Sequence, residues 1–148
     1  MTSFFPDLNV WIALSDSAHS HHSGAWRWLT MQPDGARLIF SRYTQVGLLR
    51  LLSNVAVMGD AVLTVRHAWR VYDRWLDDPR VEYYPEPRGL DAAFREATGP
   101  LGARAASKWI GDCFLLAHAK ASGSSLVTFD KALKDFAWKH DYAAILPD

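Results

Sequence analysis

Short apolar runs alternate along the chain with longer segments in which apolar residues recur at helical spacing. A short apolar run bounded by turn-forming residues is typical of a buried strand. The first run, residues 3–5, ends at Asp7. Pro6 is unfavourable for this strand, because proline has no backbone N–H to donate to a sheet. We predict buried strands over residues 3–5, 38–40, 81–84, 125–129 and 143–146.

The segments between these runs have the period of helices that bury one face. Thr64 is a residue type that caps helix N-termini, and the segment from Thr64 to Asp77 has apolar residues at helical spacing. We expect its buried face to comprise Val65, Ala68, Trp69, Tyr72 and Leu76. The pattern predicts further helices over residues 10–14, 24–31, 90–97, 110–121 and 131–137, and one that starts at residue 43.

Alternating strands and helices indicate an α/β layer fold with a central, mainly parallel sheet flanked by helices. We find no linker, repeat or low-complexity tract, so we expect a single domain over residues 1–148.

Composition narrows the possible functions only slightly. Hydrophobic residues make up 49% of the chain, and 16 Lys and Arg balance 16 Asp and Glu. A net charge of zero argues against bulk electrostatic binding of nucleic acid. No apolar run approaches the length of about 18 residues that spans a bilayer, and Cys113 is the single cysteine. These features predict a cytoplasmic protein without a membrane partner.

Aspartate outnumbers glutamate, since 13 of the 16 acids are Asp. Asp7 and Asp130 each follow a predicted strand, and ligands of open α/β sheets bind at the carboxyl ends of strands. Asp112 lies in the first turn of the helix over 110–121, above the apolar residues Leu115 and Leu116. Each aspartate alone is also typical of a turn or a helix cap.

Three acids at one sheet edge would repel one another unless a cation neutralised them. Ligands that are all oxygen favour Mg²⁺, with Mn²⁺ as a second candidate, over zinc. The residues alone therefore leave two interpretations open, an acidic metal site and a set of structural aspartates.

The order of these motifs resembles the PIN-domain family, and more narrowly VapC-type toxins of toxin–antitoxin pairs. His22, Ala25 and Trp28 also resemble a stretch found in one branch of these toxins. The other stretches that carry the resemblance are residues 7–10 (Asp-Leu-Asn-Val), 44–50 (Thr-Gln-Val-Gly-Leu-Leu-Arg), 111–117 (Gly-Asp-Cys-Phe-Leu-Leu-Ala) and 126–130 (Leu-Val-Thr-Phe-Asp).

The resemblance implies a PIN-like three-layer fold and a Mg²⁺-dependent endoribonuclease that a cognate antitoxin silences. RNA, including tRNA or another structured RNA, is the implied substrate, and a homodimer is the implied assembly. Asp7 and Asp112 would be direct metal ligands, and Asp130 would hold a metal-bound water or a second ion. Asn9 and Thr128 would support this cluster.

One position departs from the family pattern. The family usually has Glu on the helix after the second strand, and Gln45 stands there in this chain. Gln45 is expected to face the sheet, because it shares a helix face with Leu48 and Leu52. It lacks one negative charge, so metal affinity should fall. The alternative is a catalytically impaired PIN module that binds RNA or protein.

Several other residues have a functional and a structural interpretation. Arg50 is expected to form a structural salt bridge with one of the acids, and Cys113 is expected to be a core thiol. Trp11 and Trp109 flank proposed ligands and are the candidates for stacking on RNA bases. The remaining candidates are His19, His21 and His22 for zinc, or for a polar loop, and Arg42, Arg104 and Lys108 for RNA phosphates, or for a solvated face.

Overall fold

In the computed structural model, which describes residues 2–147, five short strands form one sheet in which every pairing is parallel. The strand order is β3-β2-β1-β4-β5, so the first strand lies at the centre. The strands are β1 (Ser3–Pro6), β2 (Arg37–Phe40), β3 (Val81–Tyr83), β4 (Ser125–Val127) and β5 (Ala144–Ile145).

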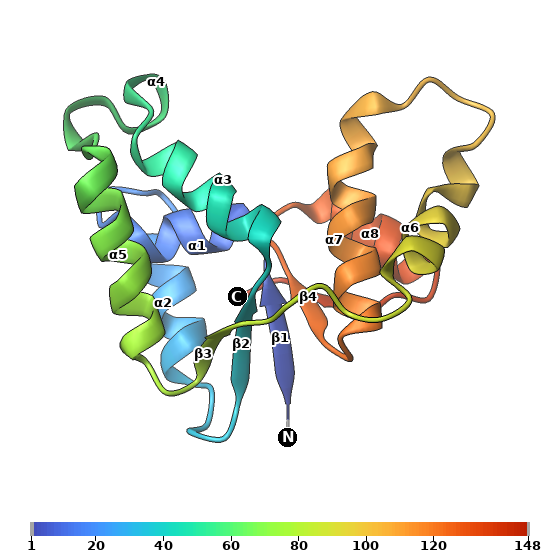
Figure 1. Ribbon diagram of the computed structural model, residues 1–148, viewed down its shortest axis with the longest axis horizontal. Coiled ribbons are helices and arrows are strands. Elements are labelled where there is room, and N and C mark those ends of the chain that lie inside the picture. Colours follow the sequence, from blue (N-terminus) through green and yellow to red (C-terminus); the bar gives the residue numbers. More distant parts are fainter. Residues whose placement is uncertain (1, 148) are drawn as a thin grey trace.

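Helices cover both faces of this sheet and produce three layers (Figure 1). The layer on one face contains α1 (Leu8–Ser15), α2 (His22–Thr30), α3 (Arg42–Leu52), α4 (Val55–Met58) and α5 (Val65–Asp77). The layer on the other face contains α6 (Leu90–Thr98), α7 (Ile110–Ala121) and α8 (Lys131–Lys139). Short 3₁₀ turns span Gly59–Ala61, Gly99–Leu101 and Ser107–Trp109. The predicted three-layer α/β fold is confirmed.

The central strand shows how the sequence builds these layers. Successive side chains of a strand point to opposite faces of the sheet. Phe4 packs edge-on against Trp28 of α2, with ring centroids 5.2 Å apart, whereas Phe5 packs on the opposite face against His118 of α7 at 4.6 Å. Strand β1 therefore contacts both helical layers through its two buried phenylalanines.

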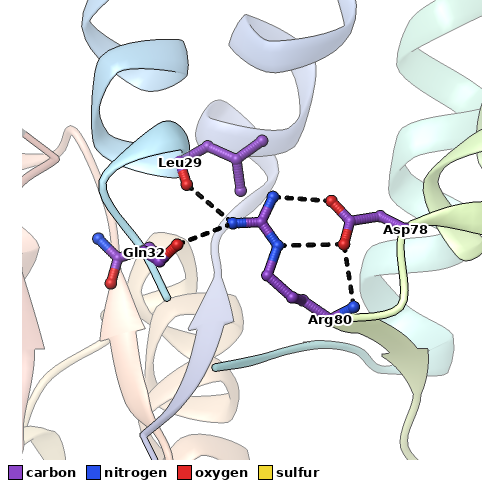
Figure 2. A network of polar contacts seen from close by, with 4 residues as sticks. All are labelled: Leu29, Gln32, Asp78 and Arg80. Atoms are coloured by element: carbon purple, nitrogen blue, oxygen red, sulfur yellow. Dashed lines mark hydrogen bonds and ion pairs between the residues drawn. The ribbon is translucent and has the colours of Figure 1, made fainter. Parts of the chain in front are cut away.

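An arginine holds the edge strand β3 next to α2 (Figure 2). Nη1 of Arg80 donates hydrogen bonds to the carbonyl oxygens of Leu29 and Gln32, at 3.0 and 3.2 Å. The same guanidinium donates to both carboxylate oxygens of Asp78, at 3.1 and 2.8 Å, and lowers the pKa of that carboxyl. These bonds attach Arg80 to carbonyl groups at and just beyond the C-terminal end of α2.

Most predicted elements form within two or three residues of their expected bounds. The helix predicted over 110–121 is α7, and Thr64 caps α5 as expected. Cys113 is fully buried, which confirms it as a core thiol. Strand β4 ends at Val127 rather than at residue 129.

The predicted buried face of α5 is wrong for three of its five residues. Ala68 and Tyr72 are buried, but Val65, Trp69 and Leu76 are 63%, 43% and 37% exposed. Helix α5 lies at the outside of its layer, so only a narrow stripe of its surface meets α3 and the sheet.

No helix within residues 2–147 has both the length and the apolar character needed to cross a membrane.

Candidate functional site

Two of the predicted aspartates lie where neighbouring parallel strands end. Asp7 follows β1 and caps the N-terminus of α1, where its carboxylate accepts a hydrogen bond of 2.6 Å from the backbone N–H of Leu8. Asp130 lies beyond the end of β4 and caps α8, where it accepts from the N–H of Leu133 at 3.1 Å. Because β1 and β4 are hydrogen-bonded neighbours, both caps lie at the same edge of the sheet.

Thr128 connects these two caps. Its hydroxyl donates to Oδ2 of Asp7 at 2.9 Å and accepts from the backbone N–H of Asp130 at 3.1 Å. Nδ2 of Asn9 donates to the same hydroxyl at 3.2 Å, while Oδ1 of Asn9 accepts from the N–H of Phe129. A hydroxyl has one proton and two lone pairs, so Thr128 uses its full hydrogen-bonding capacity in this network.

Asp112 completes the acidic group from the other helical layer. It lies in the first turn of α7 and is half-buried. Desolvation, together with the negative charges of Asp7 and Asp130, raises the pKa of its carboxyl to about 6. Burial also raises the pKa of Asp7, to which the charge of Asp130 contributes. The carboxylates of Asp7 and Asp130 are therefore close enough to Asp112 to oppose its ionisation.

The chemistry of this group fits a hard divalent cation. All three side chains offer carboxylate oxygens, and a cation among them would relieve the repulsion that raises the pKa of Asp112. The side chains are nevertheless not converged, since residues 2–147 contain no group of three His, Cys, Asp or Glu residues already arranged to hold an ion. A cation would draw the carboxylates together from their present positions.

Gln45 faces inward as expected but is engaged with another residue. Its side chain is 7% exposed, and its Oε1 accepts a hydrogen bond of 2.6 Å from Nη1 of Arg42. It also lies beside the hydroxyl of Tyr72. No contact joins Gln45 to Asp7, Asp112 or Asp130 among the described residues, so its proposed share in the acidic site stays a prediction.

The structural salt bridge predicted for Arg50 is wrong. Arg50 is exposed and pairs with no acid within residues 2–147. Its side chain instead lines an open groove of about 530 Å³ beside Leu8, the residue that follows Asp7. Arg42 is the arginine that contacts a predicted site residue.

The two stacking candidates differ in outcome. Trp11 is fully buried and stacks on Phe40 with ring centroids 4.0 Å apart, so it is unavailable to RNA and that prediction is wrong. Trp109 is partly exposed and packs against Phe136 at 5.0 Å.

The histidines near residue 20 serve packing and turn formation. His21 stacks on Phe129 at 4.3 Å, and Nδ1 of His22 lies 2.7 Å from the carbonyl oxygen of Ala13. His22 is the first residue of α2, and His21 precedes it as the cap position.

Sequence reasoning did not single out His118. It lies in the middle of α7, is 1% exposed, and neither ring nitrogen has a hydrogen-bond partner within residues 2–147. Burial lowers the pKa of its imidazole to about 4. The only sequence signal is a histidine within an otherwise apolar helix, which does not distinguish a packed ring from a functional one.

The fold and the acidic edge define an α/β domain whose candidate site lies at the carboxyl ends of parallel strands. Comparison with known families identifies the class, because the PIN domain model matches residues 4–139. The chain belongs to the PIN-domain family.

Relatives within that family share most of their length with this chain. It is 40% identical over 135 residues to Ribonuclease VapC41 of Mycobacterium tuberculosis, covering 88% of this chain and 90% of the relative. It is 32% identical over 140 residues to Ribonuclease VapC39 of the same organism, covering 88% and 91%.

Solved structures have the same fold at lower sequence identity. VapBC2 from Rickettsia felis, bound to a DNA fragment from its promoter, matches with a TM-score of 0.71 and 13% identity over 98% of both chains. Mycobacterium tuberculosis VapC20, described as a toxin that cleaves the Sarcin-Ricin loop, matches with a TM-score of 0.65 and 18% identity over 89% of this chain and 93% of that one.

Proposed function

We propose that this chain is a divalent-metal-dependent endoribonuclease of the VapC type, the toxin of a toxin–antitoxin pair. The observation that carries the proposal is the placement of three aspartates at one edge of the sheet. Asp7 and Asp130 follow neighbouring strands and are joined through the hydroxyl of Thr128, and Asp112, in the first turn of α7, lies close enough for both charges to raise its pKa. A chain that needed these acids only as turns and caps would have no reason to crowd their charges. Membership of the PIN family and the relatives named as VapC ribonucleases support the activity.

Each residue of the site has a distinct task in this proposal. Asp7 and Asp112 would hold the cation, for which their oxygen ligands favour Mg²⁺ or Mn²⁺. When bound, the ion polarises a phosphoryl oxygen and lowers the pKa of a coordinated water. Asp130 orients the attacking water. Thr128 fixes the carboxylate of Asp7 through its hydrogen bond, and Asn9 fixes Thr128. The chemistry requires no nucleophilic side chain.

The proposed partners are an RNA substrate, a cognate antitoxin and a second copy of the chain. Structural neighbours include VapBC-1 from Haemophilus influenzae, whose name joins a toxin and its antitoxin. The exposed apolar residues Val65, Trp69 and Leu76 on α5 provide a surface that a protein partner would cover. We propose a single-domain protein, because the five strands within residues 2–147 share one sheet. We also propose that it is cytoplasmic, because Cys113 is a buried free thiol.

A catalytically impaired PIN module is the less favoured alternative. It rests on Gln45, but the relatives that share 40% and 32% identity are named as ribonucleases. The bond from Arg42 to Gln45 also gives this glutamine a packing role.

The proposal is tested by incubating the purified protein with total tRNA and other structured RNAs, with Mg²⁺, with Mn²⁺ or with EDTA. We expect the wild type to cleave RNA only with a divalent cation, and Asp112→Asn to lose cleavage. Asp73→Asn is the matched control, because Asp73 is an exposed acid on α5. Cleavage that persists in Asp112→Asn or in EDTA would contradict the mechanism, and cleavage seen only in Gln45→Glu would favour the impaired module.

A further inference from the structure

A small pocket of about 60 Å³ lies between the start of α3, the segment after β3, and α7. None of its lining residues is among those assigned above to the acidic site. Six of its lining residues have side chains that can contact a planar polar ligand: Arg42, Tyr43, Tyr83, Glu86, Phe114 and His118.

The pocket adjoins the candidate active site through Tyr43 and lies next to Gln45. The hydroxyl of Tyr43 lies against Gly111, so closely that a Cβ at Gly111 would approach it to 2.6 Å, and Gly111 immediately precedes Asp112. Arg42 donates its hydrogen bond to Gln45. A ligand in the pocket would therefore lie beside a phosphate held at the acidic edge.

The walls of the pocket are flat and aromatic. The guanidinium of Arg42 lies over the ring of Tyr83 at 4.6 Å, and Tyr43 packs edge-on against Phe114 with ring centroids 5.0 Å apart. Tyr43 is 44% exposed, so it has room to turn. Aromatic rings and arginine planes are the surfaces on which proteins stack unpaired RNA bases.

The polar groups of the pocket are uncommitted. His118 is its most buried lining residue, and both of its ring nitrogens lack a partner within residues 2–147. The lowered pKa keeps its ring neutral at pH 7, with one N–H donor and one acceptor nitrogen. Glu86 is exposed and forms no ion pair or hydrogen bond with the residues that the structure describes. A buried histidine without a partner points to a ligand or an ordered water at this place.

We propose that this pocket receives the edge of one unstacked RNA base that carries an amino group beside a ring nitrogen, as cytosine and adenine do. This inference rests on the proposed ribonuclease function and makes the pocket a specificity site next to the cleaved phosphate. The carboxylate of Glu86 accepts from the amino group. The N–H of His118, which other atoms cover in the free protein, donates to the ring nitrogen once the pocket opens to uncover it. The space admits the edge of a ring and excludes a whole nucleotide.

The same groups select against uracil. Uracil presents a carbonyl oxygen where cytosine presents its amino group, and a carbonyl next to the Glu86 carboxylate would bring two acceptors together. Glu86 is thus the residue that separates the two pyrimidines, while the aromatic walls hold either one.

The test measures binding without metal or cleavage. The ring proton of His118 is followed by NMR, after its resonance is assigned with His118→Phe, during titrations with CMP, AMP, UMP and GMP. We expect CMP and AMP to shift this resonance saturably and to bind at least fivefold more tightly than UMP. Glu86→Gln should abolish that difference, whereas Glu96→Gln, a matched substitution on α6, should retain it.

The proposal is overturned if no nucleotide moves the His118 resonance, which would leave an ordered water as the only occupant, or if Glu86→Gln keeps the discrimination between CMP and UMP. Because the titration needs no catalysis, a wild type that fails to cleave RNA contradicts the proposed function alone. Cleavage of an RNA library with random bases around the cut supplies the second readout. Wild type should prefer cytosine or adenine at one flanking position, and Glu86→Gln should lose the preference.

Discussion

Thr128 donates its hydroxyl proton to the buried carboxylate of Asp7, at 2.9 Å, across 121 positions of the chain. The bond joins the ends of two neighbouring strands and fixes the orientation of an acid that is only 9% exposed. A buried carboxylate without such a donor would bear the full cost of desolvation. This bond therefore connects the stability of the fold to the geometry of the site.

Replacement of Thr128 by valine tests this connection. Thr128→Val keeps the shape of the side chain but leaves Oδ2 of Asp7 without its donor, and we expect the free energy of unfolding to fall by about 1.5–3 kcal/mol. The measurement is urea denaturation at pH 7.5. Thr128→Ser, which retains the hydroxyl, should lose less than half as much, and equal stability of wild type and Thr128→Val would contradict the role given to the bond.

The raised pKa of Asp112 predicts how stability depends on pH when no metal is present. The folded-state pKa of about 6 exceeds the ordinary value of 3.8, so the native state binds more protons than the unfolded state between these values. The contribution of protonated Asp112 is fully present below about pH 4 and is lost as the pH rises through 6. In EDTA, the melting temperature of Asp112→Asn relative to that of the wild type should rise from pH 4 to pH 7.5. A melting-temperature difference that is independent of pH would refute the shift.

Addition of a divalent cation at pH 7.5 should stabilise the wild type more than it stabilises Asp112→Asn. Mn²⁺ binds ionised carboxylates, so at pH 7.5 it should raise the melting temperature of the wild type and of the control Asp73→Asn. For Asp112→Asn, we expect at least a tenfold weaker apparent affinity, about 1.4 kcal/mol, from the loss of one charged ligand. The stabilisation should also shrink at pH 5, where protons compete for Asp112. Equal Mn²⁺ affinity of wild type and Asp112→Asn would remove Asp112 from the metal site.

Local sequence signals were sufficient for the parts of the molecule that chain neighbours determine. Helix α7 begins and ends as predicted, because its apolar period is regular and Gly123, at a φ of 69°, ends it. Asp7 and Asp130 were found because strand ends and helix caps are readable from short stretches. Strand β4 was predicted two residues too long, because the side chain of Thr128 serves the site network at the point where the apolar run continues.

The features that sequence reasoning missed depend on partners distant in the chain. Trp11 is buried because Phe40 and Trp75 pack around it, and the sequence near residue 11 does not indicate these distant partners. Arg50 was expected to form a salt bridge with one of the acids, yet it pairs with none within residues 2–147, and Arg42 is the arginine that contacts Gln45. Helical spacing defines which residues share a face, but it does not define which faces other elements cover.

Gln45 and Arg42 provide a prediction about charge at the site. In Gln45→Glu the new carboxylate would lie within hydrogen-bonding distance of Arg42, which would neutralise it. We therefore expect the single substitution to change the apparent Mn²⁺ affinity less than threefold. Combined with Arg42→Ala, it should raise the affinity at least tenfold, because the added negative charge is then no longer neutralised and attracts the divalent ion.

The readout for this pair is the Mn²⁺ dependence of the melting temperature, which requires no catalytic activity. Arg42→Ala alone is the control for loss of the guanidinium. If Gln45→Glu alone gave the full increase, Arg42 would not shield this position. If the double variant gave none, Gln45 would lie too far from the acidic group to affect a cation.

His118 gives the opposite pH dependence from Asp112. Its folded-state pKa of about 4 lies below the ordinary 6.5, so the unfolded state binds more protons between these values, and stability falls as the pH drops from 6.5 toward 4. A shift of this size corresponds to about 3 kcal/mol for a ring that is almost fully buried. His118→Phe removes the titrating group and also two ring nitrogens that lack partners. Urea denaturation should show this variant at least as stable as the wild type at pH 7 and clearly more stable at pH 4.5. If the stability of both proteins fell in parallel over that range, the pKa of His118 would not be lowered in the folded state, and the prediction would be wrong.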